Sequence, residues 1–235
     1  MNKKTDLLFY VAVMVPVLFL LSSSCSRKDN NYVFFYPSET TVKDIDGNLY
    51  HTIYIKGQTW MIENLKTTRY ANGETIPRVQ DAGSWRTLNT GACCNYNNDT
   101  LRASVYGRLY NWHAISKGKL CPNNWHVPYD YEWQKLADTL GGRAVAGGLL
   151  KEAGEAHWQN NTGATDQYGF KALPGGYRDP DGSFAAITLH GYWWSGTQFL
   201  ENYAWSRIMN SDNTSIDQTD IIKEAGFSVR CIRDY

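Results

Sequence analysis

Two aromatic-rich stretches constrain the fold of this chain more than any other feature of its sequence. They are Tyr106-Gly-Arg-Leu-Tyr-Asn-Trp-His113 and Cys121-Pro-Asn-Asn-Trp-His-Val-Pro128, and the second leads directly into a segment with apolar residues at helical spacing. Large rings gathered at the start of a helix normally belong to a core, because the burial of aromatic surface dominates core energetics. The two stretches therefore indicate a structural frame rather than a catalytic site.

The first 24 residues have the pattern of a secretory signal peptide. Lys3 and Lys4 precede an uncharged apolar run over residues 7–21, and small residues then lead to Cys25. The run is shorter than the roughly 20 apolar residues that a membrane-spanning helix needs. Small residues that end at a cysteine resemble the lipobox of bacterial lipoproteins, in the loose form that Bacteroidetes use. This resemblance implies acylation of Cys25.

The predicted organisation has three parts: a signal peptide over residues 1–24, a lipidated Cys25 with its polar tether over residues 25–38, and one domain over residues 39–235. Two or three acyl chains hold a protein on a membrane almost permanently, since each buried methylene contributes about 0.8 kcal/mol. We therefore expect an outer-membrane lipoprotein of the cell envelope, whose domain is either surface-exposed or periplasmic.

The balance of charge argues against nucleic acid as a partner. The chain has 23 Lys and Arg residues against 23 Asp and Glu residues, and no basic stripe stands out. Its 9 Trp, 16 Tyr and 20 Gly residues are typical of a loop-rich extracellular domain whose core uses large rings. The membrane is expected to be reached through the lipid rather than through a basic surface.

Four cysteines remain besides Cys25, and an even number in an exported chain predicts disulfides. Four cysteines allow three connectivities. A bridge between the neighbours Cys93 and Cys94 would need a strained vicinal ring, which normal disulfide geometry disfavours. These two residues can equally both stay reduced.

Short periodic segments predict the secondary structure. Alternating residues predict a hairpin over 42–55 that turns at Gly47, and a further strand over 58–65. The best helix covers residues 128–140, with a shorter one at 146–152, helical potential at 109–115 and a long surface loop at 80–104. Further strands are expected at 170–173, 176–178, 191–195, 203–208 and 227–232. Strands followed by helices and then strands indicate an α+β fold.

A series of motifs runs along most of the exported chain. The motifs not yet quoted are Thr41-Val-Lys-Asp-Ile-Asp-Gly-Asn-Leu-Tyr50, Gln58-Thr-Trp-Met-Ile-Glu-Asn-Leu65, Leu173-Pro-Gly-Gly-Tyr-Arg178, Tyr192-Trp-Trp-Ser195 and Phe227-Ser-Val-Arg-Cys-Ile-Arg-Asp234. In this order they resemble the Fibrobacter succinogenes major paralogous domain family, in a Bacteroidetes-type lipoprotein. The resemblance implies a C-type lectin-like fold with short antiparallel strands, one or two helices and long loops, in which a terminal strand returns beside the first. It also implies a disulfide between Cys121 and Cys231, the pairing that we favour.

The same fold is shared with formylglycine-generating enzymes, in which two cysteines near the C-terminal strand hold copper. This chain has Cys231 there, but Gly226 stands where the first of the two would lie, so a copper site lacks one thiolate. The Glu-Pro-Asn, Gln-Pro-Asp and Trp-Asn-Asp motifs of sugar-binding C-type lectins are absent, so calcium is unsupported, and the Asp-rich segments 44–48 and 179–182 fit turns. We predict no cofactor and no catalytic residue. His126 is expected in the core, and the acids Glu63 and Glu132 are expected to stand alone.

Binding through rings and amides is the function that the residues favour. Sugars present apolar faces that stack on Trp and Tyr, while Asn, Asp and Arg bind their hydroxyl groups. The loop-borne candidates are Trp85, Tyr96, Asn97, Asn98, Asp99, Trp158, Tyr177, Arg178 and Asp179. We predict a lipid-anchored, non-catalytic binding or adhesion module of the cell envelope, which engages a glycan or a surface protein. The alternatives are a modifying enzyme of the formylglycine-generating type and a structural subunit of a surface assembly.

Overall fold

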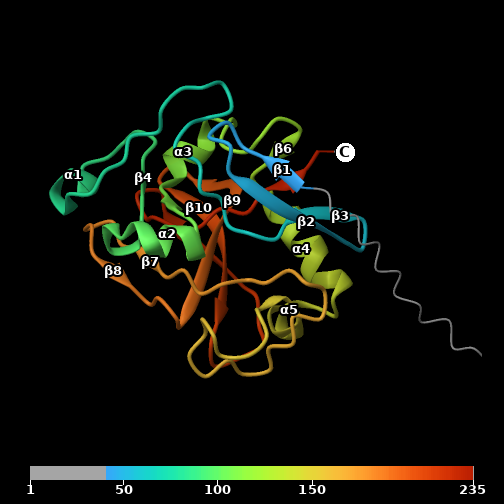
Figure 1. Cartoon of the computed structure of the whole chain (residues 1–235). Helices are drawn as coiled ribbons and strands as arrows, with labels where there is room; N and C mark the ends of the chain where they lie inside the picture. The colour runs from blue at the N-terminus through green and yellow to red at the C-terminus, as the bar shows by residue number, and fades with distance from the viewer. Residues whose placement is uncertain (1–40, 235) are drawn as a thin grey trace, which may run out of the picture. The chain divides into compact units, whose positions relative to one another are not determined.

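The computed structural model describes residues 41–234 and shows an α+β fold of short antiparallel strands and five α-helices (Figure 1). This confirms the predicted class, and the described residues lie in one compact unit. The predicted signal peptide, the lipidation site at Cys25 and the tether lie outside the described residues. None of the helices within residues 41–234 has both the length and the apolar character needed to cross a membrane.

The first sheet joins the two ends of the domain. Its strands in spatial order are β1 (Thr41–Lys43), β2 (Leu49–Ile55), β3 (Gln58–Met61), β12 (Ile232–Arg233) and β6 (Trp125–His126). The first two strands form the predicted hairpin, in which Gly47 has a φ of +84° that favours glycine. β12 pairs antiparallel with β3 and β6. The chain end therefore returns to the N-terminal sheet, as the resemblance implies, but it pairs with the third strand rather than the first.

The second sheet is buried on both faces around its central residues Trp193 and Trp194. It contains β11 (Asp217–Ile222), β10 (Tyr203–Asn210) and β9 (His190–Leu200), all antiparallel. Successive residues of a strand point to opposite faces. Trp193 therefore packs in one core cluster with Trp133, whereas Trp194 packs in another with Phe227. The sequence did not reveal β11, because its first four residues are all polar.

The structure has five α-helices where one or two were expected. They are α1 (Ala82–Arg86), α2 (Thr100–Tyr106), α3 (Trp112–Ser116), α4 (Asp130–Thr139) and α5 (Arg143–Leu150). The last two match the predicted helices, and α3 lies where helical potential was recognised. The surface loop predicted at 80–104 is wrong, because this segment contains α1, α2, a 3-10 turn at Tyr96–Asn98 and β4 (Cys93–Cys94). One or two helical turns are too short to show an amphipathic period.

Two small strand pairs complete the fold. β4 pairs with β5 (Leu109–Tyr110), and β7 (Tyr177–Arg178) pairs with β8 (Phe184–Ala185). The strand expected at 170–173 is reduced to an isolated bridge between Lys151 and Ala172. In Figure 1, α1, β7 and β8 lie together on the left, whereas α4 and α5 lie to the right.

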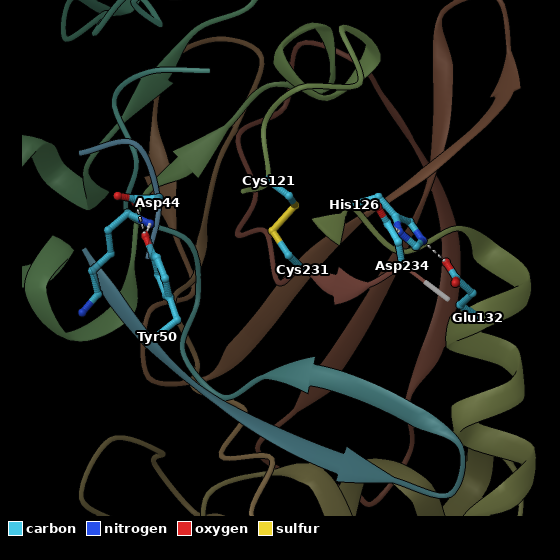
Figure 2. Close-up of a disulfide and its surroundings, with 8 residues drawn as sticks. Asp44, Tyr50, Cys121, His126, Glu132, Cys231 and Asp234 are labelled. Atoms are coloured by element: carbon cyan, nitrogen blue, oxygen red, sulfur yellow. Dashed lines mark hydrogen bonds and ion pairs between the residues drawn. A yellow bond between two sulfur atoms is a disulfide. The ribbon is translucent and has the colours of Figure 1, made fainter. Parts of the chain in front are cut away.

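The predicted disulfide is confirmed. Cys121 and Cys231 are bonded, with their Cα atoms 6.0 Å apart, and they stand 110 positions apart in the sequence (Figure 2). The bridge ties the loop before β6 to the residue that precedes β12. Cys93 and Cys94 are free and buried, and burial raises the pKa of their thiols to about 11 and about 12. These two cysteines are therefore protonated at neutral pH.

Buried cations hold the long loops through backbone carbonyls instead of carboxylates. The Nζ of Lys151 donates to the carbonyl oxygens of Thr162, Asn210 and Asn213 at 3.0, 2.9 and 2.8 Å. Burial lowers the pKa of Lys151 to about 8. Arg230 is also fully buried, and it donates to the Asn64 side chain and to the carbonyls of residues 170 and 171. The irregular region 151–171 is thus fixed by hydrogen bonds rather than by a strand ladder.

Candidate binding site

Two adjoining cavities form one groove, whose walls include the end of α1 and the β7–β8 turn. Figure 1 shows these elements on the left of the molecule. The wider cavity has a volume of about 840 Å³ and the narrower one about 390 Å³. Pro180, Tyr203 and Ile222 line both, so the two are continuous. The walls come from four separate parts of the chain: the end of α1, the β7–β8 turn, the β9–β10 hairpin and β11 with the residues after it.

Aromatic rings form the inner wall of the narrow cavity. The ring centroids of Tyr177 and Tyr192 lie 4.9 Å apart at an edge-to-face angle, and those of Tyr192 and Phe227 lie 4.8 Å apart. Tyr203 stands at the mouth and is 39% exposed. No residue within 41–234 hydrogen-bonds to the hydroxyl groups of the three tyrosines. Rings with free hydroxyl groups offer both stacking surface and hydrogen bonds to a ligand.

Two carboxylates line the same cavity. Asp179 follows β7 and Asp220 lies on β11. Burial raises the pKa of Asp179, and the nearby negative charge of Asp181 adds to that rise. Burial, with smaller contributions from Tyr177 and Asp179, raises the pKa of Tyr192 to about 12. At neutral pH the narrow cavity therefore combines neutral phenols with acidic side chains.

The wide cavity has a mixed lining that includes charged and amide side chains. Arg86, Asp181, Asn202 and Glu224 lie along it. The Oε1 atom of Glu224 lies 3.4 Å from Nε2 of His113, while its Oε2 atom is buried without a hydrogen-bond partner among the described residues. Side chains of this kind can bind the hydroxyl groups of a ligand that extends out of the narrow cavity.

Arg178 and Trp85 support the groove and do not line it. Both are fully buried, and the Arg178 guanidinium lies over the Trp85 ring and over that of Phe184. Arg178 donates to the carbonyls of Val79, Gln80 and Gly182 at 2.7, 2.9 and 3.0 Å. The structure thus places these two predicted ligand contacts inside the protein, where the side chains of Trp85 and Arg178 contact each other and donate hydrogen bonds to the surrounding backbone.

Most of the other predicted ligand contacts also have structural roles. Trp158 is buried, and its Nε1 donates to the Ala172 carbonyl at 2.9 Å. Tyr96 is nearly buried against Phe184. Asn98 donates to the Gln80 carbonyl, and Asp99 accepts from the Leu101 amide as the N-cap of α2.

Two predicted residues, Tyr177 and Asp179, line the groove. Asn97 is exposed, with a φ of +50° that asparagine tolerates, and it does not line the groove. The charged, amide and aromatic groove residues that the sequence did not identify are Arg86, Asp181, Tyr192, Asn202, Tyr203, Asp220, Glu224 and Phe227. Tyr192 belongs to the motif Tyr192-Trp-Trp-Ser195, and this motif was the one sequence signal that could have identified Tyr192.

A second polar cluster joins β6, α4 and the end of the chain (Figure 2). His126 Nε2 lies 2.8 Å from a Glu132 carboxylate oxygen, and its Nδ1 lies 2.6 Å from an Asp234 carboxylate oxygen. Burial lowers the pKa of His126, but the two carboxylates outweigh this effect and raise it overall. His126 is thus a half-buried bridge between two acids and not a core residue, and Glu132 is not alone. Glu63 is not alone either, since it lies 2.7 Å from His51.

The acidic turn at residues 44–48 is structural, as predicted. The Asp44 carboxylate accepts hydrogen bonds from the amides of Asp46 and Asn48, the Asn48 side chain and the Tyr50 hydroxyl. Within residues 41–234 no group of three His, Cys, Asp or Glu side chains has an arrangement that could hold a metal ion.

Comparison with known proteins identifies the family. No curated protein and no solved structure gives a significant match. The family model described as the Fibrobacter succinogenes major domain matches residues 53–233, which is more than half of the chain. The matched region contains β3, α4, the disulfide and all of the residues that line the groove. The chain therefore belongs to the Fibrobacter succinogenes major domain family.

Proposed function

We propose that this protein is a non-catalytic glycan-binding module held at the outer membrane by a lipid on Cys25. The proposal is supported by the residues that line the groove. Three tyrosines with free hydroxyl groups lie there beside carboxylate and amide side chains from distant parts of the chain. The apolar face of a sugar ring stacks on tyrosine, and its hydroxyl groups bind Asp, Asn and Glu side chains. The cavity volumes suit a small ligand or a short oligosaccharide.

Binding to a glycan array tests the proposal. The mature lipoprotein in nonionic detergent should bind a restricted set of bacterial or host glycans. Tyr203→Ala removes an exposed ring at the mouth of the groove and should abolish or strongly weaken these hits. Tyr131→Ala is the matched control, since Tyr131 is 66% exposed but lies outside the groove. A blank array, or hits that both variants retain, would contradict glycan binding in the groove.

The lipid anchor is tested separately. Because acyl chains would supply the membrane attachment, Cys25→Ala should move the protein from the detergent phase to the aqueous phase in a detergent partition. Replacement of the free, buried Cys94 by Ala should leave the partition unchanged. Continued membrane association of the Cys25→Ala variant would contradict lipidation.

A protein partner is the second candidate, favoured by the tip of the β9–β10 hairpin. Phe199 and Leu200 are 42% and 56% exposed there, next to Tyr203. Exposed apolar clusters of this kind are typical of protein-binding surfaces. The same exposed surface would also serve as a contact if the protein is a structural subunit of a surface assembly. Cross-linking on intact cells should then give a discrete adduct that Leu200→Ser removes.

An enzyme of the formylglycine-generating type has less support. The Cys231 sulfur is bonded to Cys121, and Gly226 has no thiol and is held in backbone hydrogen bonds with Arg178. A side chain at position 226 would also press on Arg178 and Trp85. The pair of thiolates that such an enzyme uses for copper is therefore not available at these positions.

A further inference from the structure

The narrow cavity carries an unbalanced negative charge. Asp179 and Asp220 line it, and none of its lining residues is Lys, Arg or His. Several other buried or half-buried acids are satisfied within the protein: Asp46 pairs with Arg69 at 2.6 Å, Asp130 pairs with Arg207 at 2.8 Å, and Asp44 accepts several hydrogen bonds. Within residues 41–234 no side chain donates a hydrogen bond to the carboxylate of Asp179 or Asp220.

The arginine nearest in sequence does not neutralise Asp179. Arg178 is the residue immediately before it, but successive residues of an extended chain point to opposite sides. Its guanidinium lies between Trp85 and Phe184, where backbone carbonyls take its donors. Tyr177 and Asp179 are left facing the cavity, and the cation stays on the other side of the strand.

The aromatic wall suits a cation as well as a sugar face. The faces of tyrosine and phenylalanine rings attract ammonium groups, and this attraction strengthens when the pair is withdrawn from water. Tyr177, Tyr192 and Phe227 form a corner of mutually angled rings beside Asp179. A neutral glycan would leave that carboxylate half-buried without a counter-charge, whereas an ammonium group would form a charge-assisted hydrogen bond with it.

We infer that the narrow cavity binds the protonated amine of an amino sugar, with the sugar face on the tyrosine rings and the amine at Asp179. The inference rests on the proposed glycan-binding function and adds the class of ligand. Asp220 contributes the second negative charge. The wide cavity, with Asn202, Glu224 and Arg86, receives the neighbouring sugar units of an oligosaccharide.

Titration calorimetry with two matched oligosaccharides tests the inference. The mature lipoprotein in nonionic detergent is titrated with a glucosamine tetrasaccharide and with its N-acetylated counterpart, which has no charge. The titrations are run at about pH 5.5, where the sugar amine is protonated and an ordinary aspartate is ionised. The free amine should bind about 10-fold more tightly than the acetylated sugar. Asp179→Asn should remove this preference and Asp220→Asn should reduce it, while Asp138→Asn, on the exposed face of α4 and outside the groove, should have little effect. A thermal melt of each variant checks folding.

The outcomes separate the inference from the proposed function. Equal affinity for the two sugars, with binding lost in Tyr203→Ala, would overturn the amine preference but leave glycan binding in the groove. No binding of either sugar together with a blank glycan array would overturn both. A tetralysine peptide tests the other class of ligand: if it binds as tightly as the amino sugar and loses the same affinity in Asp179→Asn, the ammonium group belongs to a protein partner, and the inference of a saccharide ligand is overturned.

Discussion

The guanidinium carbon of Arg178 lies 4.4 Å from the ring centroid of Trp85, a residue more than ninety positions earlier in the chain. Trp85 in turn donates from Nε1 to the Glu224 carbonyl at 3.0 Å. This buried pair therefore connects three walls of the groove: α1, the β7–β8 turn and the segment after β11.

Arg178→Lys should destabilise the domain by about 2 to 4 kcal/mol, because one ammonium cannot reach the three carbonyls that the guanidinium satisfies and a buried carbonyl without a donor costs about 1 to 3 kcal/mol. Chemical denaturation measures the loss. Hydrogen exchange should accelerate at residues 79–86 and 179–184. Arg86→Lys, on the exposed rim, is the control and should change neither. An unchanged denaturation midpoint for Arg178→Lys would mean that the hydrogen bonds from Arg178 to these carbonyls do not stabilise the fold.

Loss of the disulfide should have a comparable or larger effect. The bridge closes a loop of 110 residues, for which the chain-entropy account gives about 4 to 5 kcal/mol. Cys231→Ser should therefore lower the denaturation midpoint under oxidising conditions. Reduced wild-type protein should unfold at the midpoint of a Cys121→Ser, Cys231→Ser double variant. If reductant shifts the double variant as well, some other disulfide must contribute.

The His126 cluster makes stability depend on pH. Because the two acids raise the pKa of folded His126 above the ordinary value of 6.5, the folded state binds a proton more tightly than the unfolded state. The stabilisation is fully present below about pH 6.5 and is lost as the pH rises through the raised pKa. The stability advantage of wild type over His126→Gln should therefore shrink between about pH 6 and pH 9.

Asp234→Asn should diminish that pH dependence, since it removes one of the two carboxylates that hold the charged imidazole. Denaturation midpoints at a series of pH values for wild type, His126→Gln and Asp234→Asn provide the comparison. A stability difference that stays constant over this range would show that the charge on His126 contributes nothing to folding.

Sequence periodicity was enough to predict the helices and strands that are long enough to show a repeating pattern of apolar residues. The hairpin at 42–55 alternates, and α4 repeats Trp133 and Leu136 on one face, so both were predicted. The role of Trp85 depends instead on Arg178, and no local pattern shows that contact. The sequence therefore placed Trp85 among the residues that bind a ligand, whereas in the structure its ring contacts Arg178 inside the protein.

The groove escaped prediction for a related reason. Its residues run from Arg86 to Phe227, and the strand that carries Asp220 is too polar to be recognised from composition. Tyr177 and Asp179 were among the candidates because a ring and an acid borne on a loop suit a sugar, and both line the groove. The tyrosines that complete the wall belong to the second sheet, and only its antiparallel register brings β9 and β10 together.

Lys151→Met should destabilise the domain about as much as Arg178→Lys. Methionine matches the length of the lysine stem and can pack against Trp158, over whose ring the Nζ lies at 5.3 Å, but it has no donor. The partly buried carbonyls of residues 162, 210 and 213 would lose their partner, and at about 1 kcal/mol each the loss is about 3 kcal/mol. Denaturation should show this loss, and hydrogen exchange should rise across 151–171. Lys135→Met, on the exposed face of α4, should leave both unchanged. Equal stability of the two variants would mean that the loop is held by its other contacts, foremost those of Arg230 with the carbonyls of residues 170 and 171.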